Sequence, residues 1–152
     1  MSVHTIILAA GEGSRMNSNN AKSLQKIGGI SMLRKICETA GSICSDITLV
    51  VGFDKEAVIN ESNDYGLNIS TSEQPNLIGT GDAVKWGLKE VTKNSKILVL
   101  YGDVPLIKKS TLENLIDEAE SGLSILTTLL DQPYGYGRVK KDDNNNPIAI
   151  VE

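Results

Sequence analysis

The chain has 152 residues, of which 40% are hydrophobic, so it can form one globular domain, and a disordered protein is excluded. Its net charge of −4 argues against general binding to nucleic acid or to acidic membranes, because both need a basic surface. The apolar run near the N-terminus is too short to span a membrane and has no basic flank, so we expect neither a signal peptide nor an anchor.

Patterns typical of strands and helices alternate along the chain. In chain order, the spacing of apolar residues predicts a strand at Val3–Ala10, a helix at Ser31–Ile43, a strand at Asp46–Gly52, a helix at Lys55–Asn63, a strand at Leu67–Ser72, a helix at Asp82–Val91, a strand at Lys96–Tyr101, a helix from Ser110 and a strand at Leu123–Leu130. A polar-tipped hairpin follows, formed by Arg138–Lys141 and Ile148–Val151. The repeated strand–helix–strand units predict one α/β domain over residues 1–152, with a mostly parallel sheet and helices on both of its faces.

Three details of these elements carry further expectations. Ser110 and Glu113 have the spacing of a capping box at the start of a helix. Cys37 and Cys44 lie on the apolar stripe of one predicted helix, about 10 Å apart, so we expect free and unreactive thiols in a cytoplasmic protein. His4 is the only histidine and stands at the start of the first strand, so we assign it no catalytic role and do not expect nucleophilic hydrolysis.

The loop after the first strand, Gly11-Glu12-Gly13-Ser14-Arg15, has the composition of an anion site. Its glycines let the backbone bring amides close to an anion, and the planar guanidinium of Arg15 matches phosphate oxygens. It is not a P-loop, because no Gly-Lys-Ser/Thr follows, and Met16 takes the place of the third glycine of a Rossmann fingerprint. The loop continues through Asn17–Asn20, so it can wrap a triphosphate and bring Lys22 to it. A plain turn with a surface arginine is the alternative.

Two further segments carry residues suited to a ligand. Asp103 follows the strand that ends in Tyr101-Gly102, and it is a candidate Mg²⁺ ligand, since magnesium takes one or two carboxylates plus phosphate oxygens. A turn or helix-cap aspartate is the alternative. Gly79-Thr80-Gly81 begins a predicted helix and can offer amides and a hydroxyl to a base or phosphate, or be an ordinary glycine-rich helix start. Because ligands bind beyond the carboxyl ends of strands in open α/β sheets, these segments predict one site.

The order and spacing of several short segments carry more information than their composition. They are Leu8-Ala9-Ala10-Gly11-x-Gly-x-Arg15-Met16, then Lys22, then Gln74 five residues before Gly79-Thr80-Gly81, then Tyr101-Gly102-Asp103-Val104-Pro105-Leu106, Tyr136-Gly137-Arg138 and Ile150-Val151-Glu152. In this order they resemble the sugar-phosphate nucleotidyltransferases. The strongest resemblance is to the N-terminal pyrophosphorylase half of the bacterial bifunctional UDP-N-acetylglucosamine pyrophosphorylase/glucosamine-1-phosphate acetyltransferases. It runs along essentially the whole chain and implies a Rossmann-like nucleotidyltransferase fold.

The resemblance also implies a reaction and a role for each matching residue. UTP and N-acetylglucosamine 1-phosphate would give UDP-N-acetylglucosamine and pyrophosphate, with Mg²⁺ as cofactor. Arg15 and Lys22 would hold the triphosphate and act in catalysis, and Asp103 would ligate Mg²⁺. The other matching residues would bind substrate: Leu8, Ala9, Ala10 and Gly11 at the uridine and phosphates, Gln74, Gly79 and Thr80 at the uracil, Tyr101 and Gly102 at the ribose, and Gly137 and Glu152 at the acetylglucosamine.

The chain departs from this family at several positions. Ala21 and Gln25 replace a proline and a histidine near the lysine, Asp82 replaces the histidine that usually follows Gly-Thr-Gly, and Glu12 puts a carboxylate beside the phosphate loop. The family's domain continues beyond Glu152 into further sugar contacts, a second metal ligand and a β-helix domain. We therefore expect a truncated, impaired form that lacks acetyltransferase activity and is monomeric.

Two alternatives remain open at this stage. Other nucleotidyltransferases, such as the molybdenum-cofactor (MobA-like) guanylyltransferases or a cytidylyltransferase for isoprenoid precursors, share the Gly-x-Gly-x-Arg-Met loop. They do not explain Tyr-Gly-Asp-Val-Pro-Leu followed by Tyr-Gly-Tyr-Gly-Arg-Val. A non-catalytic nucleotide-binding module is the other alternative, motivated by Glu12 and by the missing C-terminal portion.

Overall fold

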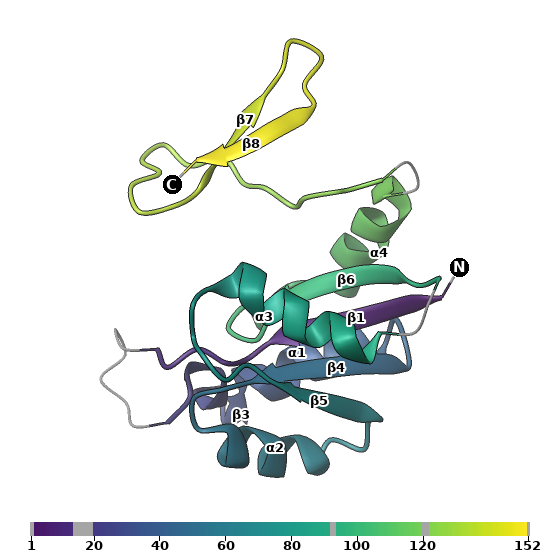
Figure 1. The fold of residues 1–152 in the computed structure, drawn as a ribbon, viewed down its shortest axis with the longest axis vertical. Helices are drawn as coiled ribbons and strands as arrows, with labels where there is room; N and C mark the ends of the chain where they lie inside the picture. Colours follow the sequence, from purple (N-terminus) through teal and green to yellow (C-terminus); the bar gives the residue numbers. More distant parts are fainter. Residues whose placement is uncertain (1, 14–19, 92–93, 120–121, 152) are drawn as a thin grey trace.

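The centre of the fold is a four-stranded parallel sheet (Figure 1). The computed structural model describes residues 2–13, 20–91, 94–119 and 122–151. The strands of the sheet are β1 (Val3–Leu8), β4 (Asp46–Val51), β5 (Ile69–Glu73) and β6 (Lys96–Tyr101), in the spatial order β5-β4-β1-β6. Each neighbouring pair is parallel, so all four carboxyl ends lie at the same end of the sheet.

Helices cover both faces of this sheet, as predicted (Figure 1). They are α1 (Met32–Gly41), α2 (Lys55–Asn63), α3 (Thr80–Gly87) and α4 (Lys109–Glu118). Successive side chains of a strand point to opposite faces. Ile7 of β1 therefore joins a large cluster with α1, α2 and α4, whereas its neighbour Ile6 packs with Val50 and Ala83 beneath α3. Both isoleucines are completely buried, so the first strand runs through the middle of the core.

The remaining elements are short or stand apart from the sheet. They are the 3₁₀ helices η2 (Lys22–Leu24) and η3 (Leu88–Glu90), the two-residue strands β2 (Lys26–Ile27) and β3 (Ile30–Ser31), and the hairpin of β7 (Arg138–Lys141) and β8 (Pro147–Val151). The predicted hairpin is thereby confirmed, and its strands are antiparallel. Figure 1 shows it separated from the sheet, beyond a long connection that starts after α4.

The predicted strand at Leu123–Leu130 is wrong, because these residues run without secondary structure. A strand needs a partner for its backbone hydrogen bonds, and the sheet ends at β6 with no further strand beside it among the described residues. Large apolar side chains of this segment are correspondingly exposed to solvent: Leu123 is 79% exposed and Leu129 is fully exposed. The apolar composition of this segment is that of a strand, but composition does not supply the neighbouring strand.

Other differences concern the ends of elements. The capping box is wrong: α4 begins at Lys109, its N-cap Lys108 has no side-chain hydrogen bond, and Glu113 instead pairs with Lys109 at 3.6 Å. The first strand ends at Leu8 rather than Ala10, although the Ala9 N–H still donates to the Val50 carbonyl at 2.9 Å. The helix predicted at Asp82–Val91 starts earlier, at Thr80, and its last turn is the 3₁₀ helix η3. The predicted bounds of α2 and β6 agree with the structure.

The cysteines are free, as expected, with Cys37 buried and Cys44 partly buried, and His4 is buried as well. Cys37 and Cys44 are both free, and burial raises the pKa of the Cys37 thiol to about 12, so this thiol stays protonated at neutral pH. Cys44 lies beyond the end of α1, with its sulfur 3.0 Å from the Thr5 hydroxyl. His4 is buried at the opposite end of β1 from the loops, where its Nε2 is 2.8 Å from the Thr48 hydroxyl.

Candidate functional site

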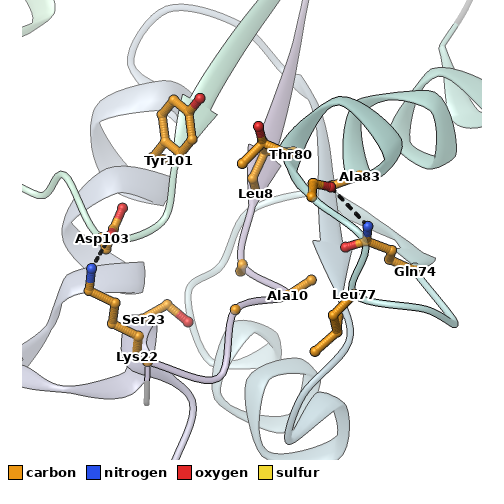
Figure 2. Close-up of a pocket in the computed structure, with 14 residues that line it drawn as sticks. Leu8, Ala10, Lys22, Ser23, Gln74, Leu77, Thr80, Ala83, Tyr101 and Asp103 are labelled. Atoms are coloured by element: carbon orange, nitrogen blue, oxygen red, sulfur yellow. Dashed lines mark hydrogen bonds and ion pairs between the residues drawn. The ribbon is translucent and has the colours of Figure 1, made fainter. Parts of the chain in front are cut away.

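A cavity of about 460 Å³ lies at the carboxyl end of the sheet, where the loops after β1, β5 and β6 converge (Figure 2). It is lined by ten of the residues predicted from the sequence: Leu8, Ala9, Ala10, Gly11, Lys22, Gln74, Gly79, Thr80, Tyr101 and Asp103. Parallel strands end on the same side, so segments almost a hundred residues apart in the sequence share one space. The cavity thus joins the three segments that the sequence analysis assigned to a single site.

The other predicted site residues are not on the cavity wall. Arg15 and Glu152 lie outside the described residues. Gly102 is buried behind the wall, where its N–H donates to the Leu8 carbonyl at 2.9 Å. A Cβ at this position would lie 3.1 Å from that same carbonyl oxygen, so the glycine allows β6 to end tightly against β1. Gly137 is exposed directly before β7 and does not line the cavity.

One side of the cavity carries an ion pair between the β1 and β6 loops (Figure 2). The Lys22 Nζ donates to the Asp103 Oδ2 over 2.5 Å, and the two side chains are 42% and 31% exposed. Lys22 is placed by the start of η2, and Asp103 by a turn in which the Val104 N–H donates to the Tyr101 carbonyl at 3.1 Å. The Lys22 ammonium and the Asp103 carboxylate therefore lie in contact and accessible to solvent on the cavity wall.

The glycines of the first loop have different surroundings. Gly13 has a φ of +69°, which L side chains rarely adopt, and a Cβ there would lie 2.7 Å from the Lys22 Cβ. The absence of a side chain at Gly13 therefore allows Lys22 to pack directly against the backbone of the loop, which sets the position of Lys22. A Cβ at Gly11 would meet nothing within 4 Å and would point into open space. The neighbouring Glu12 is exposed.

The opposite side of the cavity is built around Gln74, directly after β5 (Figure 2). Its backbone N–H donates to the Val51 carbonyl at 2.8 Å, and the residue is only 4% exposed. Its side-chain Nε2 donates to the Gly79 carbonyl at 3.1 Å and to the Asp82 Oδ2 at 3.0 Å. Residues at the start of α3 thus bind the Nε2 of the carboxamide through two hydrogen bonds. Thr80, the first residue of α3, also lines the cavity.

Sequence reasoning missed some of the lining residues. Leu77 and Ala83 add apolar surface on the Gln74 side, with Leu77 50% exposed. Asp82 was noted only as a departure from a family pattern, and its contact with Gln74 became visible only in the structure. The spacing of eight residues between them spans a loop and a helix start, so no periodic pattern indicates the contact.

A protein-family model and several known proteins match the sequence of this chain. The family model described as "MobA-like NTP transferase domain" matches residues 5–134. The chain is 46% identical over 151 residues to the protein called "Bifunctional protein GlmU" of Ruthia magnifica subsp. Calyptogena magnifica, covering 99% of this chain and 33% of that protein. For the protein of the same name in Neisseria meningitidis serogroup B the identity is 39% over 151 residues, covering 99% and 32%. The chain thus spans about a third of the length of these relatives.

The solved structures show the same fold. The 4-diphosphocytidyl-2C-methyl-D-erythritol synthase of Anaerococcus prevotii superposes with a TM-score of 0.67 at 19% sequence identity, covering 99% of this chain and 64% of that one. At this identity the likeness concerns the fold alone, and it confirms the Rossmann-like nucleotidyltransferase fold. Within the described part of the chain, no helix has the length and apolar character needed to cross a bilayer.

Proposed function

Because the chain belongs to the MobA-like NTP transferase domain family, we propose that it transfers a uridylyl group from UTP to N-acetylglucosamine 1-phosphate. The relatives named bifunctional GlmU, which align with 99% of this chain, support this choice of substrates, as do the Tyr101–Leu106 segment and the Tyr136-Gly137-Arg138 motif. The single observation that carries the proposal is the cavity, in which Lys22 and Asp103 face Gln74 across the end of the sheet.

The proposed chemistry divides the cavity into two parts. A phosphate oxygen of the sugar phosphate attacks the α-phosphorus of UTP, the bond from the α-phosphorus to the bridging oxygen breaks, and pyrophosphate leaves with that oxygen. Lys22 stabilises the negative charge that gathers on the leaving group, and we assign the same role to Arg15. Gln74, Gly79 and Thr80 hold the base on the other side, so that the triphosphate extends toward the cations.

The cavity can bind a magnesium ion if substrate phosphate oxygens complete the coordination shell of the ion. Asp103 offers a single carboxylate, and the described residues hold no group of three or more histidine, cysteine or acidic side chains. Magnesium in nucleotide sites is typically held by one or two carboxylates, with substrate phosphate oxygens and water completing its shell. We therefore propose that Asp103 binds Mg²⁺ together with the triphosphate. The ion would neutralise phosphate charge, while Lys22 gives up its contact with Asp103 and turns to the phosphates.

The assay that tests this function measures pyrophosphate release and sugar-nucleotide formation together. The chain is incubated with Mg²⁺, N-acetylglucosamine 1-phosphate and UTP, and the products are separated by anion-exchange chromatography. We expect UDP-N-acetylglucosamine and pyrophosphate in equal amounts. Parallel reactions with GTP and CTP provide the comparison: if GTP is used in preference to UTP, the guanylyltransferase alternative is correct. Binding of UTP without product from any nucleotide would instead favour the non-catalytic module.

Substitutions of the two loop glycines are expected to separate folding from binding. Gly13→Ala forces a side chain into a left-handed conformation and against Lys22, so it should destabilise the chain by about 1–2 kcal/mol and weaken UTP binding. Gly11→Ala meets no protein atom and should change the free energy of unfolding by less than about 0.5 kcal/mol. It should still weaken UTP binding, because the new methyl group occupies cavity space. Urea unfolding and calorimetric titration measure the two effects, and unchanged UTP affinity in both variants would contradict the phosphate-loop assignment.

A further inference from the structure

The carboxamide of Gln74 has neighbours that permit only one orientation. Both N–H bonds of its Nε2 are taken, one by the Gly79 carbonyl at 3.1 Å and one by the Asp82 carboxylate at 3.0 Å. Carbonyl and carboxylate oxygens only accept hydrogen bonds. If the carboxamide turned over, its oxygen would face these two acceptors, and both hydrogen bonds would be replaced by repulsion. The chemistry of the neighbours therefore fixes the orientation of the amide.

The fixed orientation leaves the Gln74 Oε1 free for a ligand. No described residue donates a hydrogen bond to this oxygen. It is also absent from the fully buried polar atoms without a partner, so it is accessible to a ligand. The residue as a whole is 4% exposed and its backbone is tied to β4 through the Val51 carbonyl, so the side chain has little room to move. In Figure 2 the carboxamide oxygen points from the cavity wall toward Ala10 and the interior. The wall therefore presents the Gln74 Oε1 as a hydrogen-bond acceptor in a fixed orientation.

We propose that Asp82, together with the Gly79 carbonyl, positions Gln74 so that the site selects bases with a ring N–H and rejects bases with an unprotonated ring nitrogen. Uracil, thymine and guanine present such an N–H, whereas cytosine and adenine present a lone pair. Asp82 is a positioning residue and does not contact the nucleotide, because its carboxylate binds the Gln74 Nε2 and the residue does not itself line the cavity. This inference rests on the proposed function, in which the base lies on the Gln74 side of the cavity.

Comparing the affinities of UTP and CTP tests this selection between bases. They share the ribose and the triphosphate and differ only in the base edge, where uracil N3–H is a donor and cytosine N3 is an acceptor. Opposite the Gln74 Oε1, uracil gains a hydrogen bond, while cytosine brings two lone pairs together and leaves a desolvated acceptor unpaired. A site built around a fixed polar group discriminates strongly against the ligand that cannot pair with it. We expect UTP to bind at least about tenfold more tightly than CTP.

The test measures the dissociation constants of UTP and CTP in the presence of Mg²⁺ by calorimetry, for the whole chain and two variants. Asp82→Asn is nearly isosteric, and its new N–H₂ group can donate to the Oε1 of a turned-over Gln74, so that only the Gly79 carbonyl still opposes this orientation. Asp82→Ala removes one of the two acceptors. In both variants we expect the preference for UTP to fall about tenfold, through tighter CTP binding as well as weaker UTP binding. Glu90→Gln is the control, since it removes one negative charge from the exposed 3₁₀ helix that follows α3.

The outcomes separate this inference from the function on which it rests. Equal affinity of the unmodified chain for UTP and CTP would overturn the inference and leave nucleotide binding intact. The inference is also overturned if the Asp82 variants weaken both nucleotides by one common factor, because a structural or purely electrostatic role changes both alike. Failure of the unmodified chain to bind UTP at all would contradict the proposed function, and this inference with it. Circular dichroism of each variant establishes that it is folded, and the near-isosteric Asp82→Asn decides the result if Asp82→Ala does not fold.

Discussion

Lys22→Ala is expected to lower kcat/KM for uridylyl transfer by about 10²–10³-fold, the usual effect of removing one donor that stabilises transition-state charge. The cation stands at the end of the first strand, beside the carboxylate to which we assign the magnesium ion. Phosphoryl-type transfer depends on positioning and charge neutralisation rather than on a covalent protein intermediate. Loss of a correctly placed cation should therefore reduce kcat more than it raises KM. Steady-state kinetics of pyrophosphate release measure both constants.

The partner of this ion pair gives a second, independent variant. Asp103→Asn keeps the size of the side chain but removes its charge, and we expect a similar loss of activity together with a higher Mg²⁺ concentration for half-maximal activity. Neither substitution should change the free energy of unfolding by more than about 1 kcal/mol, because both side chains are partly exposed and screened by solvent. Activity and stability should thus separate clearly in these variants.

A second ion pair on the same molecule serves as the control. Lys55 contacts Glu73 at 2.9 Å, and the Lys55 side chain is 42% exposed, the same fraction as for Lys22. The interaction with Glu73 raises the pKa of Lys55, but neither residue lines the cavity. Lys55→Ala should therefore leave kcat/KM unchanged. If Lys22→Ala behaves like Lys55→Ala, the Lys22–Asp103 pair is an ordinary surface ion pair and the proposed catalytic role of Lys22 is wrong.

The site could be predicted from the sequence because of a property of parallel sheets. Strands were predicted at Val3–Ala10, Leu67–Ser72 and Lys96–Tyr101, close to the observed β1, β5 and β6. Parallel strands deliver the residues that follow them to one end of the sheet. The order of the strands was not needed for this step. Lys22 and Asp103 were predicted in this way as residues of one shared site, whereas the ion pair between them was not predicted.

What the sequence did not supply were contacts that depend on a partner. The Leu123–Leu130 segment has the composition of a strand, yet no pattern within it specifies which edge it would join. The Ser110–Glu113 spacing predicted a capping box with Ser110 as N-cap, but the N-cap of α4 is Lys108, two residues earlier, so both side chains are out of capping positions. The contact of Asp82 with Gln74 links a strand end to a helix start, and its geometry depends on the turn at Gly79, where φ is +122°.

Leu49→Ala is expected to destabilise the chain by about 2–5 kcal/mol, the range for deleting a buried leucine side chain. Leu49 is completely buried in β4, inside the cluster that α1, α2 and α4 build on one face of the sheet. A domain of this size has only about 5–15 kcal/mol of stability in total, so this single change removes a large part of it. The midpoint of urea unfolding should fall while the dependence of the free energy on urea stays the same.

Leu129→Ala is the matched control, because the same atoms are removed from a side chain that is fully exposed. It should leave the free energy of unfolding within about 0.5 kcal/mol of the unmodified chain. The contrast tests whether the segment after α4 contributes to the core at all. If Leu129→Ala destabilised the chain as much as Leu49→Ala, then residues 123–130 would be packed in solution and the unpaired edge of β6 would be occupied.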